Sequence, residues 1–338
     1  TPSNSSAASD VYKRQDIVDV LPELPYQTDS RQCTYYGGGL ENYILHRSGS
    51  DHRTVISCMD AEYDVWLATK VCNPRDWDCI LLGGSEENTR RLQDVAHQLS
   101  GCITIPDCGL APGITSTLAA TLYEQGHRHL AIYCGGIPQE PPTDLGNPLR
   151  HAKSFSVAGL WREYTGAVLT RLDNQVCYMP TLHTGTEETL YIPNGGHLEA
   201  AYTSGGLSLT PETLEFESLE YYTLRWPGHF RYLRERVVWQ PDPVALLDRL
   251  LPEISSEMPD IVILYYNTFP TRKGWIWEYD HDADISAMAQ ATGYITASIA
   301  VMVHDGEIPV GGLLSMEDFR MDWVIERCRQ MPNQFTEI

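Results

Sequence analysis

Basic residues are scarce in this sequence. Its 338 residues include 24 Lys and Arg against 45 Asp and Glu, which gives a formal net charge of −21. Nucleic acids and anionic membranes attract proteins through clustered positive charge. We therefore expect neither nucleic acid nor membrane as a partner, and we interpret the excess of acids as a solubilising surface.

Long apolar runs and paired cysteines are also missing. No stretch approaches the ~20 apolar residues that cross a bilayer, and the first residues lack the charged-then-apolar order of a secretory signal. The nine cysteines are scattered without a CxxC pair. This pattern favours reduced thiols over a disulfide framework or a zinc site. We expect a cytoplasmic protein that holds no metal.

A third missing feature is the GxGxxG turn that holds a dinucleotide pyrophosphate between a strand and a helix. The only glycine cluster in residues 16–50 is Gly37-Gly38-Gly39, for which a flexible loop is the favoured interpretation. Residues 1–15 are polar and aperiodic, so we interpret them as a non-native or disordered leader. Residues 16–50 are predicted to be irregular. Either the chain lacks the phosphate-binding half of a dinucleotide fold, or it is truncated.

A β-α-β-α-β pattern follows these residues. Buried strands are predicted over 53–59, 79–84 and 102–105, with one helix over 60–71 and another that begins at the N-cap Ser85 and ends near residue 100. Such units form a parallel sheet with right-handed crossovers. The carboxyl ends of the strands should meet at the edge where open α/β sheets bind ligands, and they are Cys58, Gly83 and Asp107.

The loop from Asp107 to Gly113 is the most informative motif. It follows the third strand and precedes an apolar helix predicted over 114–123. Gly109 and Gly113 let the backbone turn sharply and approach a ligand closely. A plain strand-to-helix turn would explain the same glycines, so the loop alone leaves both interpretations open.

From about residue 126 the pattern changes to that of a mixed or antiparallel sheet. Ser156 is a candidate N-cap for a helix through 160–164. A long helix of small apolar residues over 284–303 suits close packing against a sheet. Strands are predicted over 129–134, 149–155, 175–182, 198–203, 213–224, 260–265 and 274–279, and helices over 227–236 and 243–251.

These patterns predict an α/β fold: a partial, N-terminally truncated Rossmann-like parallel-sheet domain with an inserted α+β mixed-sheet domain. The first domain should comprise residues 51–125 together with 284–338, since a small parallel sheet needs helices on both faces. Residues 126–283 should form the substrate-binding and dimerisation domain. A homodimer is expected because aromatic residues, which are enriched in interface cores, are frequent there: Tyr191, Tyr221, Tyr222, Trp239, Trp275 and Trp277.

Several motifs together resemble the saccharopine dehydrogenase-like oxidoreductases, and most closely their lysine 6-dehydrogenase branch. The resemblance covers about residues 51–320. The motifs that carry it are Val55-Ile56-Ser57-Cys58, Leu82-Gly83-Gly84, Asp107 to Gly113, Gly135-Gly136-Ile137-Pro138, Pro148-Leu149, Phe155 to Tyr164, Glu199 to Gly206, Pro211-Glu212-Thr213 and Thr223 to His229.

The sequence departs from this family at some positions. The N-terminal GxGxxG and the acid after the second strand have no counterpart, and Leu81 stands where the family usually has an acid. Tyr222 stands where many relatives have lysine, so substrate choice should differ if that lysine binds substrate. We expect the chain as written to bind nicotinamide dinucleotide weakly or not at all, whereas a form restored at its N-terminus should oxidise an amino acid with a side-chain amine.

The resemblance implies an NAD- or NADP-dependent enzyme that oxidises a CH–NH or CH–NH2 group of a small amino-acid substrate. The cofactor would take the hydride while the protein orients the reactants and excludes water. Candidate cofactor-binding residues are Cys58, Gly83, Gly84, Asp107, Cys108, Gly109, Pro112 and Gly113. Candidate catalytic residues are Arg225 and His229, and candidate substrate-binding residues are Lys153, Tyr202, Thr203, Arg225 and His229.

Each leading candidate also has a structural interpretation. Arg225 suits a carboxylate clamp because a guanidinium binds carboxylates bidentately, but it can equally be a surface residue paired with Glu220. His229 has a pKa near working pH and is a candidate base, or it donates a structural hydrogen bond. Cys108 is more simply a packing residue than a nucleophile. A non-catalytic dimerising or binding protein that keeps the fold without its cofactor is the alternative function.

Overall fold

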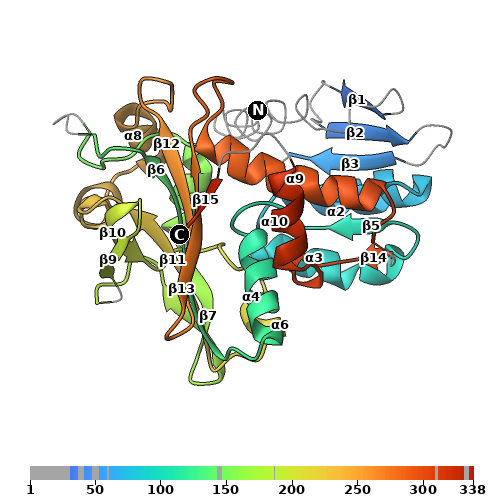
Figure 1. Cartoon of the computed structure of the whole chain (residues 1–338), viewed down its shortest axis with the longest axis horizontal. Coiled ribbons are helices and arrows are strands. Elements are labelled where there is room, and N and C mark those ends of the chain that lie inside the picture. The colour runs from blue at the N-terminus through green and yellow to red at the C-terminus, as the bar shows by residue number, and fades with distance from the viewer. Residues whose placement is uncertain are drawn as a thin grey trace.

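Two β-sheets stand side by side in the computed structural model, with helices between and around them (Figure 1). The structure describes residues 31–36, 42–47, 53–58, 61–142, 147–185, 187–308, 311–330 and 335–338. Within these ranges, no helix has both the length and the apolar character needed to cross a membrane.

The first sheet contains the parallel unit predicted from the sequence. β3, β4, β5 and β14 run parallel to one another, while β2 pairs antiparallel with β3 and β1 antiparallel with β2. The strands in sheet order are β1 (Arg31–Tyr36), β2 (Asn42–Arg47), β3 (Arg53–Ser57), β4 (Asp78–Leu81), β5 (Ile103–Ile105) and β14 (Gly312–Leu313).

Residues 16–50 were expected to be irregular, yet β1 and β2 fall within them. β1 contains Thr and two Tyr, and β2 contains Tyr, Ile and Leu, which fit a pleated strand. Their alternation is too short to stand out from sequence alone, and antiparallel pairing of β2 with β3 and of β1 with β2 supplies the missing partners. Gly37-Gly38-Gly39 lies outside the described residues.

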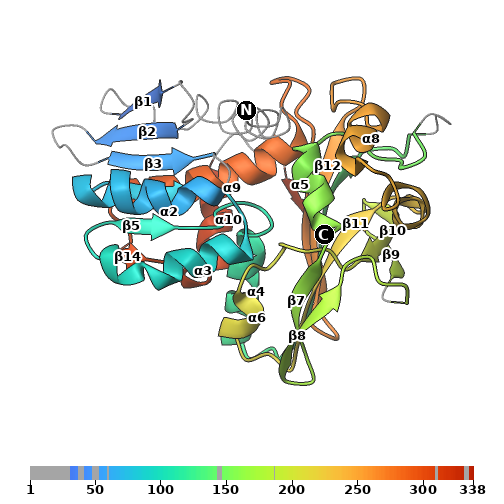
Figure 2. The same ribbon diagram turned by 180° about the vertical axis from the view of Figure 1, so that it is seen from behind.

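Helices cover both faces of this sheet. α9 (Ala287–His304) and α10 (Met321–Arg329) lie on one face, and α2 (Asp64–Trp66) and α3 (Glu86–Asp94) on the other (Figures 1 and 2). Alternating side chains enter the two cores: Ile56 and Ile80 join the core with α9, whereas Val55 and Cys79 join the core with α3. This is the two-layer covering that a buried parallel sheet requires.

The second sheet is mixed. At its centre β6 runs parallel to β11 and antiparallel to β12. Its path is β15-β13-β12-β6-β11-β10-β9, with β7 paired to β11 and β8 paired to β7. The strands are β6 (His129–Pro138), β7 (Ala167–Leu172), β8 (Gln175–Pro180), β9 (Glu188–Ile192), β10 (Gly196–Ala201), β11 (Ser218–Arg225), β12 (Asp260–Asn267), β13 (Arg272–Glu278) and β15 (Phe335–Glu337).

The described helices vary in length from single turns to the 18 residues of α9. The α-helices are α2 (Asp64–Trp66), α3 (Glu86–Asp94), α4 (Ile114–Glu124), α5 (Val157–Glu163), α6 (Thr210–Thr213), α7 (His229–Tyr232), α8 (Pro243–Leu250), α9 (Ala287–His304) and α10 (Met321–Arg329). π-Helices extend α2 over Leu67–Cys72 and α7 over Leu233–Val237. Single 3-10 turns are Ala61–Tyr63, Asn73–Arg75, Ala96–Gln98 and Met316–Asp318.

α9 connects the two sheets. It contacts β3 and β4 of the parallel sheet and β12 and β13 of the mixed sheet. Its first turn is held by Asp260 at the start of β12, whose carboxylate accepts hydrogen bonds from the N–H groups of Ala287 (2.7 Å) and Met288 (3.1 Å). Burial raises the pKa of Asp260 to about 6, against the lowering effect of those donors. The two-domain division with boundaries at 125 and 284 stays a prediction.

Three predicted elements differ in the structure. Residues 149–155 form no strand, because their apolar positions Leu149 and Ala152 pack inward and only Lys153 makes a single bridge, to Glu253. The predicted strand 213–224 begins too early, because Thr213 is the last residue of the short helix α6 and β11 begins only at Ser218. Ser85 occupies the N-cap of α3, but its side chain makes no capping hydrogen bond, whereas Ser156 caps α5 by accepting from Gly159 N–H.

The aromatic residues behind the dimer prediction divide into two groups. Trp277 and Tyr221 are buried within the chain itself, so they form core rather than interface. Tyr191 and Trp239 are 61% and 78% exposed. The homodimer stays a prediction. Fewer aromatic side chains are available for its interface than the sequence suggested.

Candidate functional site

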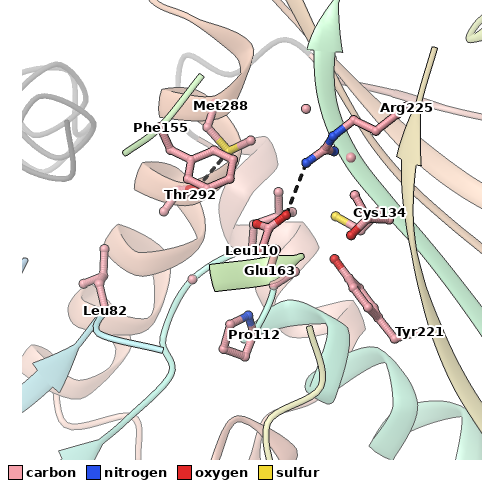
Figure 3. Close-up of a pocket in the computed structure, with 15 residues that line it drawn as sticks. Leu82, Leu110, Pro112, Cys134, Phe155, Glu163, Tyr221, Arg225, Met288 and Thr292 are labelled. Carbon is pink, nitrogen blue, oxygen red and sulfur yellow. Dashed lines mark hydrogen bonds and ion pairs between the residues drawn. The ribbon is translucent and has the colours of Figure 1, made fainter. Parts of the chain in front are cut away.

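A cleft runs between the carboxyl edge of the parallel sheet and the mixed sheet. Its inner part is a cavity of about 160 Å³, and its outer part has a volume of about 440 Å³. Both parts share Leu82, Ala111, Pro112, Phe155, Glu163 and Tyr221, so they form one continuous site. The inner part adds Gly109, Leu110, Cys134, Gly135, Gly136, Thr223, Arg225, Met288 and Thr292 (Figure 3).

The wall at the strand ends is built from backbone and small side chains. Gly84 follows β4, and a Cβ at this residue would lie 2.8 Å from the ring of Pro112. Gly113 has φ +142°, and a Cβ there would lie 1.9 Å from the carbonyl oxygen of Gly109. Only glycine fits such a close, left-handed turn. The loop predicted to be informative therefore brings its backbone to the cleft at Gly109 and Pro112.

Asp107 supports this loop from beneath. Its side chain is buried and accepts hydrogen bonds from Thr89 Oγ1 (2.7 Å) and Ser208 Oγ (2.5 Å). Burial raises the pKa of Asp107, and the two hydroxyl donors oppose that rise. Because Thr89 lies in α3 and Ser208 precedes α6, this carboxyl joins segments from both sides of the cleft.

The mixed-sheet wall comes from β11. Side chains of a strand alternate between faces, so Tyr221, Thr223 and Arg225 face the cavity together. Tyr222 and Glu220 belong to the other face, where the Tyr222 hydroxyl donates to the Glu220 carboxylate at 2.8 Å. Tyr222 therefore points away from the site, which removes the expectation that this position alters substrate choice by direct contact.

Arg225 is a buried cation in the cavity wall, with only 2% of its surface exposed. Its Nη2 lies 3.2 Å from Glu163 Oε2, its Nε donates to Tyr164 Oη at 2.9 Å, and its Nη1 donates to the Leu224 carbonyl at 2.9 Å. A guanidinium has five N–H donors. Within the described chain three of them have partners, which leaves two for a ligand in the cavity.

These contacts correct one interpretation of Arg225. It is not a surface residue paired with Glu220, because β11 places the two side chains on opposite faces. Its partner is Glu163, the last residue of α5, which is 62 positions away in the chain. A buried ion pair of this kind is strongly destabilised when one partner is removed.

Glu163 is the acidic residue among the six that line both the inner and the outer cleft. Its side chain is 28% exposed, and it lines both of them. Burial raises the pKa of Glu163 to about 7, although the charge of Arg225 opposes the rise. Figure 3 shows its carboxylate facing Arg225, between Pro112 on the strand-end side and Tyr221 on the mixed-sheet side.

His229 lies behind Arg225 and lines neither the inner nor the outer cleft. Its Nδ1 is 2.8 Å from the Leu149 carbonyl, which can only accept, so Nδ1 carries the proton. Its Nε2 then accepts from the Tyr164 hydroxyl, 2.9 Å away. Burial and the nearby Arg225 lower the pKa of His229 to about 3. This neutral imidazole has no free nitrogen toward the cavity, so the geometry favours a structural role for His229 over that of the predicted catalytic base.

The other predicted substrate residues lie outside the lining. Lys153 pairs with Asp248 (2.9 Å) and Glu253 (3.0 Å). Tyr202 donates its hydroxyl to Glu220, on the face of the sheet away from the cavity. Thr203 bonds the hydroxyl of Thr223 at 2.6 Å, directly behind the wall. Of the predicted substrate-binding set, Arg225 alone lines the cavity.

The predicted cofactor residues also divide. Gly84, Gly109 and Pro112 line the cleft. Cys58 and Cys108 are buried in the core beside it, and burial raises the pKa of the Cys108 thiol. Gly83 packs on the backbone of Ala61, where a Cβ would approach to 2.8 Å. Gly113 and Asp107 hold the loop without lining the cleft.

Sequence reasoning missed Glu163, the acidic residue of the inner cavity, and several wall residues. Phe155 and Glu163 belong to the Phe155-to-Tyr164 motif, so the family resemblance had marked the segment without giving Glu163 a role. Met288 and Thr292 come from α9, whose uniform apolar pattern gives no indication that one face borders a cavity.

None of the cysteines with described side chains forms a disulfide with another described residue, and Cys177 is the most accessible of them. In the part of the chain that the structure describes, no three His, Cys, Asp or Glu side chains are grouped as a metal site would need. Cys134 lines the cavity, but burial raises the pKa of its thiol to about 12.

The part of the chain that forms most of the cavity matches a known protein family. Residues 109–331 match the saccharopine dehydrogenase C-terminal domain family, which covers more than half of the chain. The chain therefore belongs to the saccharopine dehydrogenase C-terminal domain family. The matched range includes the Gly109-to-Gly113 loop, Glu163 and Arg225, so the cavity lies largely within it.

Solved structures share the fold. Apo saccharopine dehydrogenase (L-Glu forming) from Saccharomyces cerevisiae superposes with a TM-score of 0.59 at 17% identity, over 84% of this chain and 84% of that chain. Homospermidine synthase from Legionella pneumophila, in complex with NAD, superposes with a TM-score of 0.55 at 10% identity, over 80% of this chain and 72% of that chain. The predicted α/β class, with a parallel sheet and a mixed sheet, is thereby confirmed.

Proposed function

We propose that this protein is an NAD(P)-dependent oxidoreductase that acts on a CH–NH or CH–NH2 group of an amino acid. The observation that supports this most is the buried Arg225, whose guanidinium keeps two N–H donors for a ligand in a cavity that opens onto the carboxyl edge of a parallel sheet. Ligands of open α/β sheets bind at that edge.

Arg225 selects the substrate class. A carboxylate is the anion that a planar guanidinium binds best, by two parallel N–H donors. Tyr164 and His229 fix the guanidinium through a chain of hydrogen bonds, from Arg225 Nε–H to Tyr164 Oη and from Tyr164 O–H to His229 Nε2. The remaining walls are apolar at Leu110 and Met288, which suits the carbon chain of an amino acid.

The strand-end wall fits the nicotinamide end of a dinucleotide. The outer cleft is wide there and offers backbone at Gly84 together with the flat surfaces of Ala111 and Pro112. Glu86, Glu87 and Arg162 border the same cleft, and the two glutamates disfavour a pyrophosphate beside them. Leu82, Gly84, Ala111 and Pro112 would hold the nicotinamide, which when bound accepts a hydride from the carbon that bears nitrogen.

The names of the similar structures support this class of reaction. One is a saccharopine dehydrogenase, and the other was solved with NAD. Within the class we retain the saccharopine dehydrogenase and lysine 6-dehydrogenase types as the two candidate substrate choices. A cytoplasmic location and a homodimer belong to the same proposal.

A turnover assay tests the proposal. The 338-residue chain is mixed with NAD⁺ or NADP⁺ at high concentration, since weak dinucleotide binding is predicted, and with lysine or saccharopine. We expect formation of the reduced dinucleotide, seen by its absorbance, with one of the two. Arg225→Lys should lose most of this turnover, and its matched control is Arg231→Lys, since Arg231 is an exposed arginine that pairs with Glu235 among the described residues.

Binding without turnover would support the alternative function instead. Suppose calorimetry shows that an amino acid or a dinucleotide binds, while no combination of amino acid and dinucleotide is converted. In that case the chain is a binding protein with the family fold. Absence of both binding and turnover would contradict the oxidoreductase proposal.

A further inference from the structure

We propose that the Glu163 carboxylate is the group that takes the proton from the substrate nitrogen. This inference rests on the proposed function and adds a residue to it. Among the described residues, Glu163 is the one acidic side chain that lines both the inner cavity and the outer cleft, while Glu86 and Glu87 border only the outer cleft.

The position of Glu163 matches the place where the reactants meet. The outer cleft offers the nicotinamide wall, and the inner cavity ends at Arg225. Glu163 is shared by the two and lies 3.2 Å from Arg225 Nη2. A substrate carboxylate on Arg225 therefore brings a nitrogen on the carbon next to that carboxylate to Glu163, and the reacting carbon bound to this nitrogen would lie toward the strand ends.

The other titratable groups of the cavity do not suit the task. Burial raises the pKa of Cys134 to about 12 and raises that of Tyr221 well above its ordinary value. Arg225 is always charged and only donates. Tyr164, next to Glu163, has a raised pKa and already donates to His229. Efficient acid–base catalysis needs a pKa near the working pH, which among these groups leaves Glu163.

The proton balance is simple. An amino acid presents its nitrogen as an ammonium or as a protonated secondary amine, which has no lone pair to form a C=N bond. Transfer to Glu163 breaks one N–H bond, forms one O–H bond on the carboxylate, and leaves the electron pair on nitrogen. The neutral amine can then lose hydride from its carbon to the oxidised nicotinamide. Glu163 returns its proton to solvent through the outer cleft.

Arg225 sets the strength of this base. With an empty cavity, burial raises the pKa of Glu163 to about 7, and the charge of Arg225 keeps that rise smaller than burial alone would make it. A substrate carboxylate on Arg225 offsets some of that positive charge. The Glu163 carboxylate then accepts a proton more readily when substrate is bound, so base strength and substrate binding are coupled.

The test compares Glu163→Gln and Glu163→Asp with wild type, using the pH dependence of kcat/KM. For wild type we expect an acid limb with an apparent pKa near 7, the value to which burial raises Glu163. Glu163→Gln should lose this limb and lower kcat by about 10²–10⁴-fold, the usual contribution of a general base. Glu215→Gln, at an exposed residue, is the matched control and should behave as wild type.

Glu163→Asp keeps the proposal testable if the glutamine variant does not fold. It preserves the charge beside Arg225 but withdraws the carboxylate by one methylene, so we expect a kcat at least about tenfold lower with the acid limb retained. Carbon-13 NMR of glutamate carboxyls, without dinucleotide, gives a second measurement. One signal should titrate near pH 7 in wild type and be missing in the Glu163 variants.

The outcomes separate the two proposals. If wild type turns over and Glu163→Gln keeps both its rate and its acid limb, Glu163 is a structural partner of Arg225 and the inference is wrong. Wild-type kcat in Glu163→Asp would also overturn it. If wild type converts no amino acid with either dinucleotide, the proposed function fails and this inference fails with it.

Discussion

The two walls of the cleft are built in opposite ways. The strand-end wall from Gly84 to Gly113 uses backbone and small side chains, and no charged side chain of these described residues enters the inner cavity. The mixed-sheet wall places Arg225 and Glu163 in the same cavity, with Tyr164 and His229 behind them. One wall is defined by shape and the other by charge.

This difference indicates how each wall can change. A wall made of close backbone contacts tolerates almost no added atoms, because a Cβ would overlap neighbouring atoms. A wall made of buried charges tolerates changes of shape but not the loss of a partner, since a lone charge in the interior is strongly destabilising. Substitutions on the two walls should therefore fail for different reasons.

The largest effect is expected from Gly113→Ala on the strand-end wall. The residue has φ +142°, and its new Cβ would overlap the Gly109 carbonyl, so the loop must shift. We expect a loss of at least about 4 kcal/mol in the free energy of unfolding, from backbone strain together with the overlap. Urea denaturation measures it.

Gly126→Ala is the matched control for this prediction. Gly126 also has a positive φ, +92°, but a Cβ there would meet nothing within 4 Å. Strain alone should destabilise it by about 1 kcal/mol. Equal losses in the two variants would mean that the close contact at Gly109 does not define the wall.

On the charged wall, Arg225→Ala should mainly affect substrate. Removing the guanidinium should lower kcat/KM for the amino acid by about 30- to 4,000-fold, equivalent to 2–5 kcal/mol for a buried hydrogen-bonded charge pair. Arg225→Lys should recover only some of this loss, because an ammonium cannot bind a carboxylate through a planar fork. Steady-state kinetics with Arg231→Ala as control measure the effect, and an unchanged kcat/KM would return Arg225 to a structural role.

Acid should weaken the charged wall through His229. Its pKa is lowered in the folded protein to about 3, whereas an unfolded histidine titrates near 6.5. The folded state therefore holds fewer protons, so this stability is complete above pH 6.5 and is lost as the pH falls toward 3. Between pH 7 and pH 5 the loss should be about 2 kcal/mol.

The measurement must separate His229 from groups whose contribution to stability changes with pH in the opposite direction. Glu163 and Asp260 have raised pKa values, so their contribution is present at low pH and is lost as the pH rises toward about 7 and about 6. The quantity to compare is the change in unfolding free energy from pH 7 to pH 5 in wild type and in His229→Gln. If His229→Gln shows the same change in unfolding free energy as wild type, His229 is not a buried neutral imidazole.

The smallest effect is expected for Tyr222→Phe. This hydroxyl bonds Glu220 and Tyr202 on the far face of β11. Its removal should leave KM and kcat within about twofold of wild type and change stability by about 1 kcal/mol, the net value of a typical hydrogen bond. A large change in KM would show that the far face of β11 communicates with the cavity.

The strand-end wall was the more predictable of the two. The order of β3, β4 and β5 and the turn from Asp107 to Gly113 follow from local signals: β-branched runs, glycines at strand ends and an apolar helix after them. These features depend on residues close together in the chain. The strand order and the turn can therefore be predicted without a structure.

The charged wall was less predictable. Arg225 was found through a motif, but its partner Glu163 lies 62 residues away and was not found. The alternation of a strand decides whether Arg225 faces Glu163 or Glu220, and the start of β11 was placed five residues early, within a segment that includes α6. His229 looked like a base because sequence does not show what occupies its two nitrogens.

α9 has a mechanical consequence for the whole molecule. One continuous helix packs on strands of both sheets, and Asp260 fastens its first turn to the mixed sheet. Any rotation of one sheet relative to the other must break contacts on one side of this helix. We therefore expect the cleft to keep a nearly constant width, and the two sheets to melt in one cooperative transition despite their different architectures.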